Sequence, residues 1–193
     1  NNTGRTSDNF NKHKNYAIRK MSFRFTPFND REMGFIAVCP IFPRYSKKLG
    51  GWKNYTHALD RDTLLCDTEV LKRIDLQLIK MLEDAAGKIG TAINIEIEPE
   101  IFMFGFSASA HFVNRFSLLH PELVKACAIG GFNGHLMLPL DEIDGTKLIY
   151  PVGVYDYKEI TGREFLAENF AHNTLQKPFY DFVPNYDESL MEP

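Results

Sequence analysis

Short apolar runs alternate along the chain with longer segments in which apolar residues recur every three or four positions. The short runs are Phe35–Cys39, Ile101–Phe104 and Ala126–Ile129. A run of this length without polar interruption is typical of a strand that is covered on both faces. Glycine or proline follows each run directly and supports its end as a strand boundary.

Two of the segments beside these runs have a clear helical period. Apolar residues recur at intervals of four from Ala17 to Phe25 and predict a helix that Pro27 interrupts. Another helix is predicted from about Ala108 to Leu119, because the pair His120-Pro121 follows it and disfavours helical backbone.

A longer helix is predicted between the first two runs. Asp67 can cap it, and Glu69 is placed favourably in its first turn. Gly87 and Gly90 mark its expected end. Its buried stripe is expected to contain Val70, Ile74, Leu78, Met81, Leu82 and Ala85.

Strands that alternate with helices predict an α/β fold with a parallel sheet and helices on both faces. The length of 193 residues predicts one domain over residues 1–193. In such sheets, binding and catalytic groups collect at the carboxyl ends of the strands. We therefore expect a site in the segments that follow Cys39, Phe104 and Ile129.

Composition excludes several classes of protein. Lys and Arg number 22 and Asp and Glu 25, so the net charge is −3, and 44% of the residues are apolar. This apolar fraction is too large for a disordered chain. No apolar stretch approaches the ~20 residues that a membrane-spanning helix needs. Because there is also no stripe of Lys and Arg, we expect neither nucleic acid nor a membrane as a partner.

The cysteines bear on the compartment. Three separated cysteines predict neither a zinc site nor a disulfide framework, and their odd number favours reduced, buried thiols in a cytoplasmic setting. Against this, the triplets that begin at Asn1 and Asn54 fit the glycosylation acceptor pattern of secreted proteins. The compartment therefore stays open.

The second apolar run leads into the sequence GFSASA. A serine on a sharp strand-to-helix turn is held in a strained backbone conformation, with its hydroxyl exposed above the sheet. Such a turn needs small residues two positions before and two positions after the serine. Gly105 and Ser109 meet this requirement about Ser107, whereas the bulky His111 would violate it about Ser109. Ser107 is therefore the predicted nucleophile.

The segment FMFGFSASAHFVNRFSLLHPELVKACAIGGFNG resembles the nucleophile turn, following helix and next strand of the α/β-hydrolase superfamily. Its closest likeness is to esterases of the feruloyl-esterase and polyhydroxyalkanoate-depolymerase type. Upstream, GFIAVCPIFPR is similar to the strand and Pro-Arg turn before the connecting helix, so the resemblance covers most of residues 1–135. It implies a three-layer αβα sandwich whose first strands would precede this chain.

The resemblance also implies an oxyanion hole, in which two backbone N–H groups stabilise the tetrahedral intermediate. The N–H of Ala108, directly after the nucleophile, is one expected donor. The second would come from the region of Thr3 and Gly4, where the family carries a glycine-containing loop. The family's usual His-Gly is replaced here by Asn and Thr, and a solvated tail is the alternative.

A serine hydroxyl becomes a good nucleophile when a histidine accepts its proton and a carboxylate orients that histidine. The superfamily order is serine, acid, histidine, and only His172 follows a plausible acid. A predicted strand over residues 147–156 would carry Asp156 at its carboxyl end. Asp181 precedes Val-Pro as the family's acid does, but with a spacing one residue shorter and no convincing strand before it. With Asp181 as the acid, the histidine would lie beyond the last residue, and both acids stay candidates.

Other constellations are interpreted as structural. His111 lies one turn beyond Ser107 on a helix that leaves the expected site, which favours a surface or capping role. The acidic residues between 141 and 144 lack the spacing of a calcium-binding loop, and Gly145 after them predicts a turn. Trp52 and Tyr55 are expected in the core rather than in an acyl or aryl pocket.

Together these observations predict a serine hydrolase that cleaves carboxylic esters through an acyl-enzyme on Ser107. Such an enzyme takes a small-molecule ester and needs neither a metal nor an organic cofactor. Two alternatives remain: a serine peptidase that uses the same turn, and a hydrolase-like binding or scaffold domain without turnover. The sequence does not indicate an oligomeric state.

Overall fold

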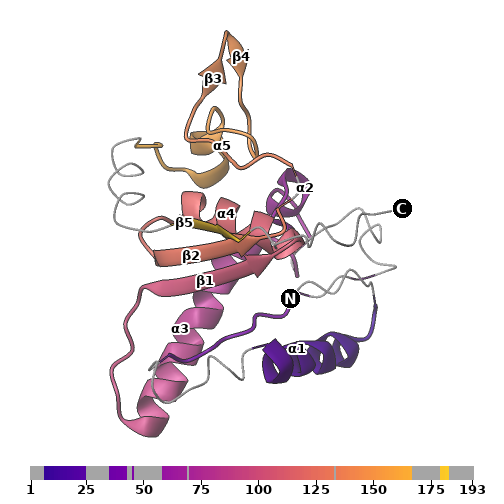
Figure 1. Ribbon diagram of the computed structural model, residues 1–193, viewed down its shortest axis with the longest axis vertical. Coiled ribbons are helices and arrows are strands. Elements are labelled where there is room, and N and C mark those ends of the chain that lie inside the picture. The colour runs from indigo at the N-terminus through magenta and orange to yellow at the C-terminus, as the bar shows by residue number, and fades with distance from the viewer. Residues whose placement is uncertain are drawn as a thin grey trace, which may run out of the picture. The chain divides into compact units, whose positions relative to one another are not determined.

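Residue contacts divide the chain into two compact units, Asn1–Pro99 and Glu100–Pro193. The computed structural model describes residues 7–24, 35–42, 45, 58–68, 70–132, 134–166 and 179–182 (Figure 1). The first unit contains α1 (Phe10–Arg24), α2 (Arg61–Leu64) and α3 (Ile74–Ile93). The second contains β1 (Ile101–Phe106), α4 (Ala108–Leu119), β2 (Val124–Gly130), β3 (Glu142–Ile143), β4 (Thr146–Lys147), α5 (Tyr157–Thr161) and β5 (Phe179–Phe182). The single domain expected from the chain length stays a prediction.

Helix α1 confirms the first helical pattern. Asn9 caps it, because its Oδ1 accepts a hydrogen bond of 2.9 Å from the N–H of Asn11. Ala17 and His13 are buried on one side of the helix, as residues four apart share a face. Met21, on the same side, is half-buried. The next position of the pattern, Phe25, lies outside the described residues.

Helix α3 differs from its prediction at both ends. It begins at Ile74 rather than after Asp67, because Arg73 has a left-handed φ of 48° that interrupts helical backbone, and Val70 is exposed. It continues past Gly90 to Ile93, since isolated glycines weaken a helix without breaking it. Left-handed Asn94 then ends it. Of the predicted stripe, Ile74 and Leu78 are buried, and Met81, Leu82 and Ala85 are half-buried.

The strand predicted at Phe35–Cys39 is wrong. The described residues 35–42 form no strand, and Phe35, Ile36 and Val38 are exposed. An apolar run has the propensity to be a strand, but it becomes one only when a neighbour accepts its ladder hydrogen bonds. None of the described strands pairs with this run.

The second unit is built on a small parallel sheet in the order β1-β2-β5, which is compatible with the predicted α/β class (Figure 1). Strands β1 and β2 both extend beyond their predicted ends. Helix α4 connects them and matches its prediction of Ala108 to Leu119. Because consecutive parallel strands need a crossover, α4 packs back on one face of the sheet, beside Gly105. On the other face Phe102 and Phe104 remain more than half exposed, so the expected cover on both faces is not met within the described residues.

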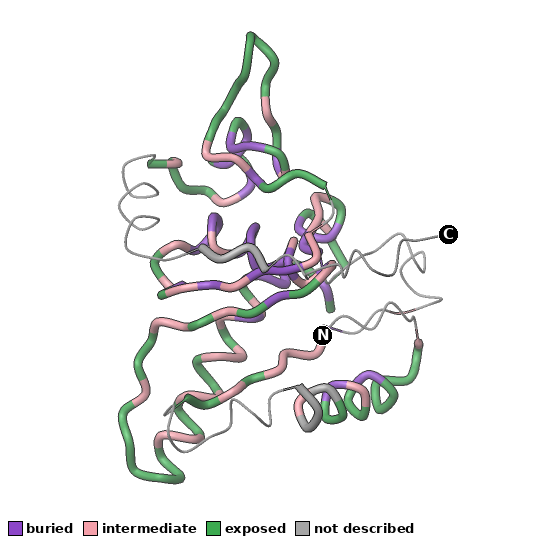
Figure 2. Tube along the Cα trace, viewed as in Figure 1, coloured by how far each residue is buried: buried purple, intermediate pink, exposed green. Residues whose placement is uncertain are grey.

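Helix α4 and strand β2 form much of the core of this unit, and buried stretches of the trace are seen there in Figure 2. Cys127 is buried there, whereas Cys39 and Cys66 in the first unit are half-buried, so the expectation of buried thiols holds for one of the three cysteines. After β2, the chain forms a hairpin of β3 and β4. Asp144 and Gly145 both have positive φ in its two-residue turn, which confirms the turn predicted there.

Candidate functional site

Ser107 lies between the end of β1 and the start of α4, and its backbone is strained. Its φ of 59° and ψ of −125° fall in a region that residues with a side chain rarely occupy. Such a conformation costs of order 1–3 kcal/mol and persists only where the surroundings enforce it. Here the N–H of Ser107 donates a hydrogen bond of 2.9 Å to the carbonyl of Gly130, at the end of β2. The strained turn predicted at Ser107 is therefore confirmed.

The small residues on either side of Ser107 allow strand and helix to cross closely. A Cβ atom added at Gly105 would lie 2.2 Å from the carbonyl oxygen of Ser109 and 2.8 Å from Cγ2 of Val113. No side chain fits at that distance, so β1 and α4 reach their observed approach only with glycine at this position. The requirement for small residues two before and two after the serine thus has a direct steric cause.

The N–H of Ala108 is available at the start of α4. Ala108 is the first residue of the helix, and the first N–H groups of a helix have no carbonyl partner within it. The helix dipole adds a partial positive charge at the same end. An oxygen that develops negative charge beside Ser107 would meet both effects.

The segment after β2 runs along the beginning of α4. The ring of Phe132 packs against the ring of His111 with their centroids 4.1 Å apart. Further on, Asn114 Oδ1 accepts a hydrogen bond of 2.9 Å from the N–H of Met137. The surface or capping role expected for His111 is wrong, because its half-buried ring packs against a loop. Asn114 was missed by the sequence analysis, although a lone Asn on an apolar helix face was a signal of such a tie.

Asp156 has a structural role. The strand predicted over residues 147–156 is wrong, because only Lys147 belongs to a strand, and turns, a bend and irregular backbone occupy the rest. Asp156 is buried, and its Oδ1 accepts a hydrogen bond of 2.8 Å from the N–H of Tyr150. The carboxylate therefore closes a turn within its own segment, and no strand carries it to the edge of the sheet.

Asp181 lies in strand β5, although no strand was expected before it. In the parallel register, Asp181 pairs with Ile129 of β2, and Ile129 pairs with Gly105 of β1. Asp181 and Gly105 are therefore at the same height in the sheet, toward its carboxyl end and two strands apart. Adjacent strands lie about 4.8 Å apart, so the two backbones are separated by about 10 Å.

Several predicted site residues lie outside the described residues. They are His172, the expected base, and Thr3 and Gly4, the expected second oxyanion donors. Trp52 and Tyr55, expected in the core, are also outside them. Their assignments stay predictions.

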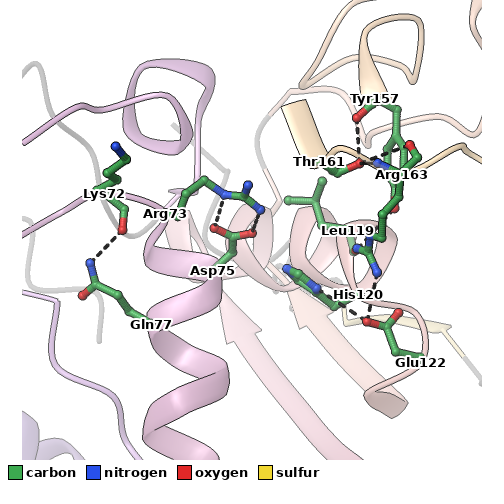
Figure 3. A network of polar contacts seen from close by, with 10 residues as sticks. All are labelled: Lys72, Arg73, Asp75, Gln77, Leu119, His120, Glu122, Tyr157, Thr161 and Arg163. Atoms are coloured by element: carbon green, nitrogen blue, oxygen red, sulfur yellow. Dashed lines mark hydrogen bonds and ion pairs between the residues drawn. The ribbon is translucent and has the colours of Figure 1, made fainter. Parts of the chain in front are cut away.

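A second polar cluster surrounds the C-terminal end of α4 (Figure 3). The carbonyl of Leu119 accepts hydrogen bonds from the Tyr157 hydroxyl, at 3.3 Å, and from the Arg163 guanidinium. Arg163 also donates a 3.3 Å hydrogen bond to Glu122, whose carboxylate lies 3.7 Å from Nδ1 of His120. The cluster joins α5 and the segment after it to the C-terminal end of α4, whereas Ser107 lies at the N-terminal end of that helix.

The charges in this cluster shift its titration. Burial alone would raise the pKa of Glu122, but the His120 imidazole, the backbone N–H of Glu122 and the Arg163 guanidinium together lower this pKa from 4.5 to about 2. Burial raises the pKa of the Tyr157 hydroxyl, which therefore remains a donor. The cluster lines an open depression of about 310 Å³ beside Phe165 and Leu166. Its polar groups already bind one another, so we interpret the cluster as structural.

The described residues were compared with the requirements of a metal site and of a membrane-spanning helix, and the chain was compared with known proteins. Among the described residues, no group of three or more His, Cys, Asp or Glu side chains could hold a metal ion. None of the helices in the described part of the chain has the length and apolar character required to cross a membrane. No family model, no curated protein and no solved structure matches the chain.

Proposed function

We propose that the protein is a serine hydrolase that cleaves carboxylic esters through an acyl-enzyme on Ser107. The observation that carries this proposal is the backbone of Ser107, with φ 59° and ψ −125° between a parallel strand and a helix. A strained serine in this position is costly for stability and is the conformation that exposes a nucleophilic hydroxyl in α/β-hydrolases. A turn that only joined a strand to a helix would have no need of it.

The arrangement around Ser107 supports an α/β-hydrolase fold. In that fold the nucleophile follows a parallel strand, and its helix returns to the neighbouring strand, as β1, α4 and β2 do. A further parallel strand, β5, lies beside β2. The three-layer sandwich implied by the resemblance is part of the proposal.

The proposed reaction assigns a role to each group. Ser107 Oγ attacks the ester carbonyl and passes its proton to a histidine, and the N–H of Ala108 stabilises the oxyanion. The alcohol leaves with that proton, and water then releases the acid from the acyl-enzyme. Because the superfamily order is serine, acid, histidine, His172 fits as the base with Asp156 as the acid, whereas no histidine of this sequence follows Asp181. The second oxyanion donor is assigned to the region of Thr3 and Gly4.

Of the two acids, Asp181 is the better candidate. It is part of a strand, at the height of Gly105 near the carboxyl end of the sheet. Acid residues of this superfamily follow the nucleophile along the chain, which fits Asp181. Asp156 instead accepts a hydrogen bond from the N–H of Tyr150 within its own turn. We therefore assign the acid to Asp181.

Covalent labelling of the full chain with a fluorophosphonate tests this proposal. We expect one phosphonyl adduct, located on Ser107 by peptide mass spectrometry and absent in Ser107→Ala. Ser109→Ala is the matched control, because alanine keeps a small residue where Gly105 approaches α4, and it should still be labelled. A folded protein that takes no label at any concentration would support a binding or scaffold domain instead.

Substrate assays then separate an esterase from a peptidase. We expect release of p-nitrophenol from p-nitrophenyl esters and no cleavage of casein or of peptide p-nitroanilides. Peptide cleavage at rates comparable to ester cleavage would overturn the esterase assignment while leaving Ser107 as the nucleophile.

A further inference from the structure

The residue that caps α4 and two residues within the helix share one of its sides. Ser107, His111 and Asn114 are spaced by four and three positions, and residues at these spacings lie on one helix face. The segment after β2 lies along this face. We define the loop wall as Gly131, Phe132, Gly134 and Met137.

The loop wall begins with a turn that only glycine permits. Gly131 has a φ of 60°, and a Cβ atom there would lie 2.8 Å from the ring of Phe106. Phe106, directly before Ser107, therefore packs on the backbone of the loop wall. The turn brings the next side chain, Phe132, onto the ring of His111 at 4.1 Å.

Two further contacts hold the loop wall on α4. Gly134 has a φ of 113° and lies beside His111, because a Cβ atom there would be in ordinary van der Waals contact with its Cε1, at 3.8 Å. The N–H of Met137 donates its 2.9 Å hydrogen bond to Asn114, and both residues are only 4% exposed. A buried hydrogen bond of this kind is costly to leave unmade, so the loop wall has little freedom to move away from the helix.

We propose that Phe132 limits the length of the acyl group that can bind at Ser107, and that Asn114 is a positioning residue that holds the loop wall in place. This inference rests on the proposed hydrolase function. It makes the preferred substrates esters of short carboxylic acids.

The geometry of an attacked ester supports this limit. Its carbonyl carbon must lie at Ser107 Oγ and its carbonyl oxygen near the N–H of Ala108, so the rest of the molecule extends to the side. On the side of β2, Ser107 is tied to Gly130 by a hydrogen bond of 2.9 Å, and the loop wall follows directly. An acyl chain that extends this way meets Phe132, whose ring packs against the ring of His111 with centroids 4.1 Å apart.

The test compares p-nitrophenyl acetate with p-nitrophenyl octanoate as substrates of the full chain. We expect the wild type to prefer acetate, and Phe132→Ala to raise the octanoate-to-acetate ratio of kcat/KM about tenfold, the discrimination that one or two methylene groups give in a pocket. Phe132→Trp should lower the ratio. Phe102→Ala removes a phenyl ring at the far end of β1 and is the matched control, for which we expect the wild-type ratio.

The positioning role of Asn114 is tested by the same octanoate-to-acetate ratio of kcat/KM. Asn114→Leu removes the acceptor for Met137 and should raise the ratio, because a loosened loop wall admits longer chains. Asn114→Asp keeps an acceptor oxygen and should retain the wild-type ratio. A role in stability alone would change both rates equally and leave the ratio unmoved.

The outcomes separate this inference from the proposed function. If the wild type is labelled at Ser107 and hydrolyses acetate, but the ratio is unchanged in both Phe132→Ala and Phe132→Trp, the limit at Phe132 is overturned and the hydrolase stands. If the wild type neither takes the label nor hydrolyses either ester, the hydrolase is overturned and this inference with it. Should Phe132→Ala fail to fold, Phe132→Trp alone decides, since an unchanged ratio there also overturns the limit.

Discussion

At its N-terminal end, helix α4 begins beside Ser107, whose backbone is strained and whose neighbour Ala108 presents an N–H without a partner in the helix. At its C-terminal end, the carbonyl of Leu119 accepts hydrogen bonds from Tyr157 and Arg163. One end therefore keeps backbone groups available at the cost of strain, whereas the other end satisfies them with side chains. A helix end that is left open under strain is the arrangement expected of a reactive site, and a satisfied end is the arrangement expected of a structural joint.

The largest effect expected concerns the strain at Ser107. Ser107→Gly removes the hydroxyl and puts a residue without a Cβ atom at a φ of 59°. We expect ester hydrolysis to fall at least about 1000-fold, because the nucleophile is lost. The free energy of unfolding should rise by about 1 kcal/mol, since relief of strain outweighs the greater freedom of glycine in the unfolded chain.

Rates of p-nitrophenyl acetate hydrolysis and urea denaturation measure the two effects. Ser109→Gly is the control, because Ser109 lies within the helix, where glycine lowers stability by up to about 1 kcal/mol. If Ser107→Gly is less stable than the wild type, the torsion angles at this turn are not a source of strain.

The next effect concerns the crossing of β1 and α4. In Gly105→Ala the added methyl group would lie 2.2 Å from the backbone of Ser109, which cannot yield as a flexible side chain would. We expect a loss of about 3 kcal/mol in the free energy of unfolding, from overpacking against backbone. Gly87→Ala is the matched control, because nothing lies within 4 Å of its Cβ position and a helix gains about 1 kcal/mol from this change.

Both variants can be followed by thermal and urea denaturation. A Gly105→Ala protein as stable as the wild type would mean that strand and helix do not approach as closely as described, and the steric argument for Ser107 would fail with it.

At the other end of α4, a smaller effect is expected. Arg163→Leu removes donors to Leu119 and Glu122, but the carbonyl of Leu119 keeps its hydrogen bond from Tyr157. Because no buried acceptor is orphaned, we expect a loss of about 1 kcal/mol in the free energy of unfolding. Lys158→Ala, which breaks only the exposed ion pair with Glu164, should cost about 0.5 kcal/mol or less.

Labelling at Ser107 distinguishes the two ends of the helix. We expect the fluorophosphonate to label Arg163→Leu at the rate of the wild type, since this end of α4 has no part in the proposed reaction. A labelling rate at least tenfold lower would contradict the separation between a reactive and a structural end.

The smallest effect concerns the pH dependence of the structural end. The pKa of Glu122 is about 2 in the folded chain and 4.5 when unperturbed, so the unfolded chain binds more protons between these values. The stability that Glu122 contributes is therefore present above about pH 4.5 and is lost as the pH falls toward 2. Because the Glu122 side chain is 52% exposed, solvent screening keeps this contribution small.

Urea denaturation of the wild type and of variants at pH 6 and pH 3 measures the contribution of Glu122 to the free energy of unfolding. Glu122→Gln should lose less stability than the wild type between these two pH values. Glu159→Gln, a loss of charge at an exposed position of α5, is the control for a general effect of net charge. Equal losses in Glu122→Gln and the wild type would contradict the lowered pKa.

The part of the fold that was predictable from the sequence is the part held by contacts close along the chain. The strand before Gly105, the helix after Ser107 and the strand before Gly130 were all predicted, because apolar period and turn residues act within a few positions. Predictions failed where distant partners decide. Phe35–Cys39 has strand propensity but no described strand beside it, and Asp181 lies in a strand that pairs with β2 far earlier in the chain.

The residues of the candidate site also fall into those that local sequence could predict and those that it could not. Ser107 could be predicted because its turn needs small residues at fixed spacing, which is a steric condition within one short segment. The sequence left two candidate acids open, since their surroundings depend on distant contacts: Asp156 accepts a hydrogen bond within its own turn, and Asp181 lies in a strand of the sheet. For Asn114, the sequence could indicate a buried hydrogen bond of its side chain but not Met137 as the partner, because nothing local shows which amide a buried Asn will bind.

By itself the amino-acid sequence determined which segments become strand or helix around Ser107 and that the turn between them is tight, because sterics and hydrophobic period are local. Only the tertiary structure decided the order of the strands, the height of Asp181 in the sheet and the packing of Phe132 on His111. These depend on pairing between segments that are far apart in the chain, where many partners have similar propensity and only the packed whole selects among them.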